Sequence, residues 1–165
     1  MSPHIFLVAG EESGDRLGAA LIAAIKQRTK GQVHFSCVGG AHMAAEGVPS
    51  LFPLGDLAII GFAAIPKSLP KILRRIREAA DAVISAKPDV LVIIDSPDFT
   101  HRVAKRVRAK LPEIPIIDYV CPSVWAWRPS RARAMRAYVD HVLALLPFEP
   151  KILAELGGPP CTYVG

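Results

Sequence analysis

Short, wholly apolar runs recur along this chain of 165 residues, and stretches with helical periodicity separate them. Two of these runs are residues 5–9 (IFLVA), which end at a glycine, and residues 90–94 (VLVII), which end at an aspartate. Continuous apolar strands are typical of a parallel sheet that helices cover on both faces. The alternation of strand and helix therefore predicts an α/β fold, a Rossmann-like doubly wound domain with a mostly parallel sheet.

The same patterns place the remaining elements. Helices are predicted from Ser13 to about residue 30 and at residues 41–46, 68–86, 100–111, 129–138 and 147–156. Further strands are predicted at residues 33–38, 114–120 and 141–145, and one more begins near residue 161. Because ligands bind at the carboxyl ends of strands in such sheets, the loops of interest are residues 10–15, 39–42, 95–99 and 119–128.

Composition narrows the class of protein. Apolar residues make up 51% of the chain and charged residues 21%, which excludes a disordered chain, a collagen-like fibre and a coiled coil. The length predicts one domain, no apolar run is long enough to span a bilayer, and the start lacks a secretory pattern, so we expect a cytoplasmic protein. Cys37, Cys121 and Cys161 lack metal-binding spacing and are expected to be reduced and structural, with no metal or other cofactor.

The net charge of +5 is unevenly distributed. Residues 66–77, 99–112 and 121–139 contain 14 of the 20 lysines and arginines and no acid. These windows predict either ordinary solvated helix faces or a surface that meets phosphate groups. Nucleic acid is not expected as the partner, because the loops at the strand ends are acidic.

Two strand-end loops are rich in carboxylates. In residues 9–15 (AGEESGD), Ser13 could cap a helix, whereas Glu11, Ser13 and Asp15 together would suit sugar hydroxyls; the loop matches neither a P-loop nor a dinucleotide fingerprint. In residues 95–99 (DSPDF), Asp95 ends a buried strand, where partial desolvation can make it a general base. Asp98 has a structural alternative, because it could cap the following helix.

The third loop carries both tryptophans of the chain. Trp125 and Trp127 could wall a pocket for sugar rings or acyl chains, or they could be core residues. Arg128 follows them and is suited to a phosphate. Ser123 lacks the surroundings of a hydrolase nucleophile and is grouped with these three as substrate-binding.

Five segments, in this order and spacing, resemble the lipid-A-disaccharide synthase family: residues 9–15, 39–47, 95–99, 122–128 (PSVWAWR) and 146–149 (LPFE). The resemblance implies the acceptor-side domain of a two-domain GT-B glycosyltransferase, which works without metal at the cytosolic face of the inner membrane. It implies the substrates UDP-2,3-diacylglucosamine and 2,3-diacylglucosamine 1-phosphate, with Asp95 as the catalytic residue. On physical grounds, Arg128 is the best candidate in this chain for holding the acceptor phosphate.

Family members are about twice as long as this chain. We therefore expect residues 1–165 to form a single N-terminal domain without the donor-binding domain, and completion by a homodimer or a separate chain remains open. The alternatives are another sugar-nucleotide enzyme of the same fold, or a non-catalytic module that binds membrane surfaces.

A membrane contact is also predicted from the residues themselves. The uncharged stretch 57–65 directly precedes a basic window, and an apolar wedge beside cations suits an anionic membrane surface. The alternative is that this stretch is core and the cations face water. The predicted contact residues are Ile59, Ile60, Phe62, Lys71, Arg74 and Arg75.

Overall fold

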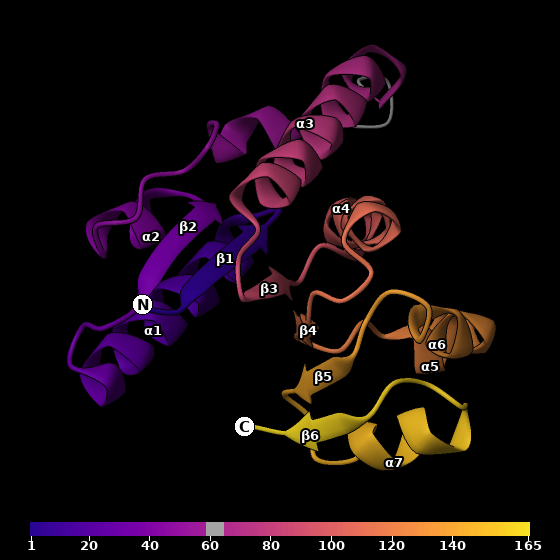
Figure 1. Cartoon of the computed structure of the whole chain (residues 1–165). Helices are drawn as coiled ribbons and strands as arrows, with labels where there is room; N and C mark the ends of the chain where they lie inside the picture. Colours follow the sequence, from indigo (N-terminus) through magenta and orange to yellow (C-terminus); the bar gives the residue numbers. More distant parts are fainter. Residues whose placement is uncertain (59–64) are drawn as a thin grey trace.

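The computed structural model of the chain describes residues 1–58 and 65–165 and contains one parallel sheet (Figure 1). Within these residues the sheet has six strands in the order β2-β1-β3-β4-β5-β6, and every neighbouring pair is parallel. The predicted Rossmann-like α/β class is confirmed. The strands are β1 (His4–Ala9), β2 (His34–Val38), β3 (Val90–Ile94), β4 (Ile116–Tyr119), β5 (His141–Ala144) and β6 (Cys161–Tyr163).

Helices connect the strands in the right places, although some boundaries differ from the prediction. α4 begins three residues before the predicted start, because Pro97 occupies the first turn, where a missing N–H does no harm. The short α5 was predicted as a loop. The helices are α1 (Glu12–Thr29), α2 (Ala41–Ala45), the 3₁₀ helix η1 (Leu54–Leu57), α3 (Ile65–Ala86), α4 (Pro97–Lys110), α5 (Val124–Trp127), α6 (Pro129–Met135) and α7 (Glu149–Glu155).

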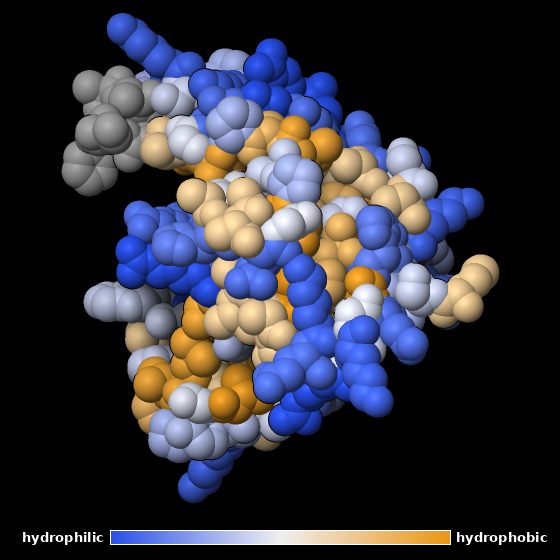
Figure 2. Space-filling view, turned by 90° about the vertical axis from the view of Figure 1, so that its left-hand side faces the viewer, coloured by the Kyte–Doolittle hydropathy of each residue, from blue (hydrophilic) through white to orange (hydrophobic). Residues whose placement is uncertain are grey.

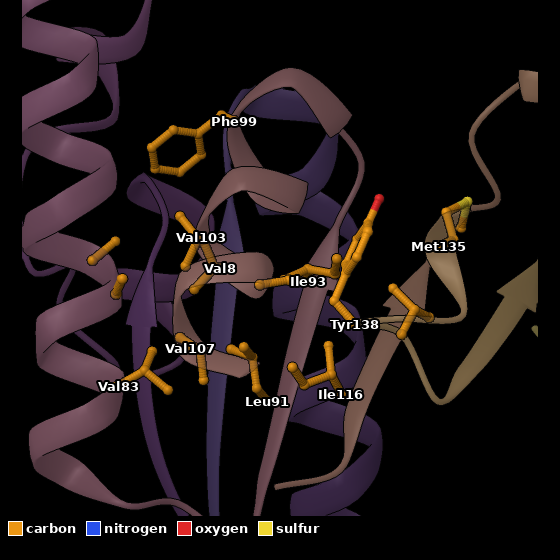
Figure 3. Close-up of a cluster of buried hydrophobic side chains, with 14 of the residues drawn as sticks. Val8, Val83, Leu91, Ile93, Phe99, Val103, Val107, Ile116, Met135 and Tyr138 are labelled. Atoms are coloured by element: carbon orange, nitrogen blue, oxygen red, sulfur yellow. The ribbon is translucent and has the colours of Figure 1, made fainter. Parts of the chain in front are cut away.

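The two central strands bury side chains on both faces of the sheet. On one face, Leu91 and Ile93 of β3 pack with side chains of α3 and α4, such as Val83 and Val103 (Figure 3). On the other face, alternate residues of β1 and β3 pack against α1 and α2 in a second cluster that includes Ile22. This two-sided burial explains why these strands are continuous apolar runs.

The strand order creates a topological switch point between β1 and β3. The chain leaves β1 towards β2 on one side, whereas β3 leads to β4 on the other. The loops that follow β1 and β3 lie side by side at this switch point, at the carboxyl edge of the sheet, where ligands of such folds bind.

The outer part of α3 extends beyond the sheet (Figure 1), and ion pairs connect η1 to this helix. Asp56 of η1 pairs with Lys71 at 3.0 Å, and its carboxylate also accepts hydrogen bonds from Arg75. Arg75 additionally pairs with Glu78 and lies over the Phe52 ring, 4.6 Å from its centroid. The basic window 66–77 thus has acidic partners from outside it, which the sequence window did not reveal.

On the side of α2 and β2, apolar side chains gather in separate patches among hydrophilic ones (Figure 2). A groove of about 530 Å³ lies beside β2 on the edge of the sheet and is lined mainly by apolar residues such as Phe35 and Val48. No helix in the described residues combines the length and the apolar composition needed to cross a membrane.

The stability that the contact between η1 and α3 provides should decrease at acid pH. Hydrogen bonds from Lys71 and Arg75 lower the pKa of Asp56 below its ordinary value. A lowered pKa in the folded state gives stability that is present at neutral pH and is lost as the pH falls from about 4 through the folded-state value. We expect wild type to unfold at a higher temperature than Asp56→Asn at neutral pH, with the difference shrinking in acid. An equal difference at both pH values would contradict this role for the ion pairs.

Candidate active site at the carboxyl edge of the sheet

Asp95 directly follows β3 at the switch point, and its backbone is strained. Its φ is 55° and that of Ser96 is 44°, so two consecutive non-glycine residues adopt the left-handed region. The amide of Asp95 donates to the carbonyl of Tyr119 at 3.1 Å, and Thr100 Oγ1 donates to the carbonyl of Asp95 at 2.7 Å. Strain held in this way by surrounding bonds is common where a fold must aim a functional side chain.

The neighbouring loops share this strained, close-packed character. Val120, just after β4, has a φ of 82°, which is rare for a β-branched residue. The loop after β1 touches the loop after β3 so closely that a Cβ on Gly10 would lie 2.6 Å from Ser96 Cβ. Ser96 Oγ is buried there without a hydrogen-bond partner among the described residues. The carboxyl edge is thus built from loops that fix one another.

Ser13 links the start of α1 to the loop after β3. Its hydroxyl oxygen lies 2.9 Å from Asp95 Oδ2 and 3.1 Å from Glu11 Oε1, so a single hydroxyl proton serves two carboxylates. The predicted capping role is wrong, because α1 begins at Glu12 and no side chain caps it. Ser13 instead orients Asp95, and Glu11 is exposed beside them. The structure therefore brings these three predicted residues together.

Asp15 does not join this group of side chains. It is 1% exposed, and its Oδ1 accepts hydrogen bonds from the amides of Gly40 at 2.8 Å and Met43 at 3.0 Å. Its Oδ2 accepts from the amide of His42 at 2.9 Å. The carboxylate thus ties α1 to the start of α2, and this burial gives it a structural role in place of the predicted contact with substrate.

Replacing Asp15 should destabilise the fold. Asp15→Ala leaves three amides without an acceptor, one of them buried and two half-buried, and hydrogen bonds to a charged group contribute about 1.5–3 kcal/mol each to stability. We expect the free energy of unfolding, measured by urea denaturation, to fall by about 3 kcal/mol or more. Glu12→Ala is the matched control, since Glu12 pairs with Arg16 on the exposed surface of the same helix turn. Equal effects of the two changes would contradict the structural role.

A cavity of about 510 Å³ opens beside this edge, between α4 and the α5–α6 segment. Four of its lining side chains are cations, and no ion pair is formed by these four within residues 1–58 and 65–165. They are Arg102, Lys105, Arg128 and Arg131. Asp98 also lines the cavity and lies inside the first turn of α4, so its predicted capping position is wrong: the N-cap is Ser96.

The residues of the third loop divide between two environments. Ser123, Trp127 and Arg128 line the cavity, and Trp127 is 83% exposed. Trp125 points elsewhere: its indole N–H donates to Glu149 Oε1 at 3.2 Å, and its ring meets Phe148 edge-on. Trp125 thus helps to fix α5 against α7. A helix of four residues separates two side chains that a strand would have placed on one face.

Sequence reasoning missed a buried hydrogen-bonded chain in the wall of the cavity. His101 Nε2 lies 2.8 Å from Asp118 Oδ2, and His101 Nδ1 lies 2.9 Å from the hydroxyl of Tyr138. Burial raises the pKa of Asp118, which the hydrogen bond from His101 opposes, and burial raises the pKa of Tyr138 to about 12. The only signal in the sequence was an aspartate inside an apolar strand, which predicts a buried partner without identifying it.

The cysteines are free thiols. Burial raises the pKa of Cys37 to about 12, that of Cys161 to about 11, and that of Cys121 as well. Thiols with such raised pKa values are poor nucleophiles at neutral pH. The described residues contain no cluster of three or more histidine, cysteine or acidic side chains that could hold a metal ion.

Solved structures share the fold of this chain at low sequence identity. A UDP-GlcNAc 2-epimerase from Neisseria meningitidis bound to UDP-GlcNAc matches 98% of this chain and 46% of its own, with a TM-score of 0.68 and 11% identity. MurG from Acinetobacter baumannii matches 88% of this chain and 42% of its own, with a TM-score of 0.51 and 18% identity. These likenesses support the Rossmann-like fold.

Curated relatives are much closer in sequence. The lipid-A-disaccharide synthase of Nitrobacter hamburgensis is 69% identical over 164 residues, and that of Bradyrhizobium diazoefficiens is 66% identical over 161 residues. These matches cover 99% and 98% of this chain but 41% of each relative, so the chain spans about two fifths of their length. A family model described as "LpxB: Lipid-A-disaccharide synthetase" matches residues 5–165. The chain therefore belongs to the lipid-A-disaccharide synthase family.

Proposed function

We propose that this chain forms the acceptor-binding part of a glycosyltransferase of lipid A biosynthesis. The reaction joins UDP-2,3-diacylglucosamine to 2,3-diacylglucosamine 1-phosphate and releases UDP and lipid A disaccharide 1-phosphate. The observation that carries the proposal is the carboxylate of Asp95 at the switch point, which Ser13 orients and which is followed in the chain by Pro97 and Asp98 in the wall of a cationic cavity. Membership of the family supplies the substrate class.

Asp95 is proposed as the general base. An acceptor hydroxyl oxygen attacks the anomeric carbon of the donor sugar, the bond from that carbon to UDP breaks, and the hydroxyl proton passes to Asp95 Oδ. Ser13 donates to Oδ2, which leaves Oδ1 for the acceptor hydroxyl. The hydrogen bond fixes the carboxylate orientation before substrate arrives, and such positioning lowers the barrier to proton transfer.

The cavity is proposed to hold the acceptor phosphate. Arg128 and its three neighbouring cations supply the positive charge, and the exposed ring of Trp127 offers a platform for the sugar or an acyl chain. Asp98 and Ser123 also line the cavity and are proposed to bind sugar hydroxyls. Groups that stabilise the departing UDP are proposed to lie in the part of the relatives that this chain does not span, whether in the same chain, a separate chain or a homodimer partner.

Replacing Asp95 tests the proposed reaction most directly. The assay uses a chimaera of this chain followed by the remaining part of the Nitrobacter hamburgensis relative, with disaccharide as the measured product. Asp95→Asn keeps the shape and the Ser13 contact but removes the base, and removal of a general base lowers turnover by about 10²–10⁴-fold.

The matched control is Glu113→Gln, which removes an exposed carboxylate from the loop that precedes β4, at the opposite edge of the sheet. We expect this variant to keep wild-type turnover. Near-normal turnover of a folded Asp95→Asn protein would rule out Asp95 as the base. Epimerised UDP-sugar in place of disaccharide would favour a different sugar-nucleotide enzyme of the same fold.

A peripheral position at the cytosolic face of the inner membrane is proposed for the outer part of α3. Leu69 and Leu73 are 48% and 37% exposed at adjacent positions of one helix face, and Lys67 and Arg74 are exposed beside them. Such a face suits an anionic lipid surface. The predicted contacts Ile59, Ile60 and Phe62 lie outside the described residues. Lys71 and Arg75 are paired with Asp56, so the exposed Arg74 is the better candidate for lipid contact.

Charge reversal on α3 should weaken binding to anionic vesicles. Each basic residue near such a surface contributes about 1 kcal/mol, so Lys67→Glu/Arg74→Glu should lower partitioning by at least about tenfold. Arg106→Glu/Lys151→Glu changes the charge equally on α4 and α7, and we expect it to bind nearly as wild type in vesicle co-sedimentation. Equal losses for both double variants would indicate an effect of net charge and would contradict a contact through α3.

A further inference from the structure

The wall of the cationic cavity contains a hydrogen-bonded chain that the proposed reaction does not use. Tyr138 and His101 both line the cavity, and each is 8% exposed. Behind them, Asp118 is 1% exposed. Figure 3 shows the Tyr138 hydroxyl pointing away from Leu91 and Ile116 of the buried cluster. The chain therefore runs from a buried carboxylate, through an imidazole, to a hydroxyl at the cavity wall.

The two bonds of His101 restrict where the protons can be. When Asp118 is ionised and no further proton is present, Nε2 must carry a hydrogen to face the carboxylate, so Nδ1 is a bare acceptor. Tyr138 must then donate its single hydroxyl proton inward to Nδ1. In this state Tyr138 offers only lone pairs to the cavity, which repel an anion.

One added proton reverses this arrangement. If the imidazole takes it, Nδ1 carries a hydrogen and donates to the Tyr138 oxygen. The same holds if Asp118 takes it on Oδ2 and donates to Nε2, because the single hydrogen of the neutral imidazole then resides on Nδ1. The hydroxyl proton of Tyr138 is released and can be donated to a group in the cavity. An anion that requires this donor is therefore bound more tightly when the pair of His101 and Asp118 holds the extra proton.

We propose that the cavity binds a dianionic phosphomonoester together with one proton, which the pair of His101 and Asp118 takes up and which turns the Tyr138 hydroxyl towards the anion. The identity of the anion as a sugar phosphate rests on the proposed function, whereas the coupling rests on the geometry of the three side chains. Tyr138 is thus a binding residue, and His101 and Asp118 are positioning residues that act through it.

Other charged groups near Asp118, His101 and Tyr138 also affect how readily these side chains take up a proton. Lys105 Nζ lies 5.1 Å from the centroid of the Tyr138 ring, and the charge of Asp95 raises the pKa of Asp118 in addition to burial. The remaining charged or titratable groups near the three side chains, within the described part of the chain, are Asp98 and Arg102 of α4, Arg128 and Arg131 beside the cavity, and the thiols of Cys121 and Cys161. A test must therefore compare wild type with variants in which one of these three hydrogen-bonded side chains is changed.

Sulfate is the probe for the coupling, because it stays a dianion in the range used and takes up no proton itself. Calorimetry measures its affinity for the 165-residue chain between about pH 5.5 and about pH 8. We expect wild type to bind at least about fivefold more tightly at the lower pH, since coupling to one proton permits up to about tenfold per pH unit. Buffers of different ionisation enthalpy should report proton uptake on binding.

Variants separate the effect of proton coupling on sulfate binding from the effect of the cavity cations. Tyr138→Phe and Asp118→Asn should still bind sulfate, but with less than about twofold change across the range, because the donor or its proton store is gone. Arg102→Gln should bind more weakly at both pH values with the wild-type ratio, and Asp98→Asn should also keep that ratio. Circular dichroism confirms that each variant is folded.

The outcomes divide clearly. No binding of sulfate by wild type would overturn the anion site, and a ratio that survives in both Tyr138→Phe and Asp118→Asn would overturn the coupling. Displacement of sulfate by glucosamine 1-phosphate at lower concentration than by UDP supports the phosphomonoester, and the reverse order would overturn that assignment. If the coupling is found while the chimaera forms no disaccharide, the inference stands and the proposed function falls.

Discussion

The burial of β1 and β3 on both faces is the constraint on which the rest of the structure depends. Helices cover each face, and β1 and β3 lead to strands on opposite sides, so the loops that follow them lie at a switch point of the sheet. The close approach of Gly10 to Ser96 packs these two loops against each other. The strained backbone at Asp95 and Ser96 persists because these packed loops leave it no alternative.

The sequence predicted the fold class and most elements because a buried parallel strand is continuously apolar and a covering helix is periodic. The sequence also predicted the position of Asp95, since a carboxylate directly after a buried parallel strand lies at the carboxyl edge of the sheet. The role of Asp15 could not be predicted, because it depends on α2 approaching α1 across 25 residues of chain. The hydrogen-bonded chain of Asp118, His101 and Tyr138 joins three segments that are far apart in the sequence, and no local sequence pattern indicates it.

Charge shows the same contrast between sequence and structure. Three windows without acids predicted a surface for phosphates, but the fold brings Asp56 to Lys71 and Arg75, and Asp140 to Arg108. These cations stabilise contacts within the chain. Four cations that line the cavity form no ion pair within residues 1–58 and 65–165: Arg102 and Lys105 of α4, Arg131 of α6, and Arg128 directly before α6. Three-dimensional pairing therefore selects which basic residues are free to bind phosphate, and it moves the predicted phosphate surface to the side of Asp95.

The most direct test of the central claim, that this edge of the sheet receives a phosphorylated sugar acceptor, is a crystal structure of the chain with glucosamine 1-phosphate. The account predicts the phosphate among Arg102, Lys105, Arg128 and Arg131, with a sugar hydroxyl within hydrogen-bonding distance of Asp95. Binding of the sugar phosphate in the apolar groove beside β2, with the cationic cavity empty, would contradict it.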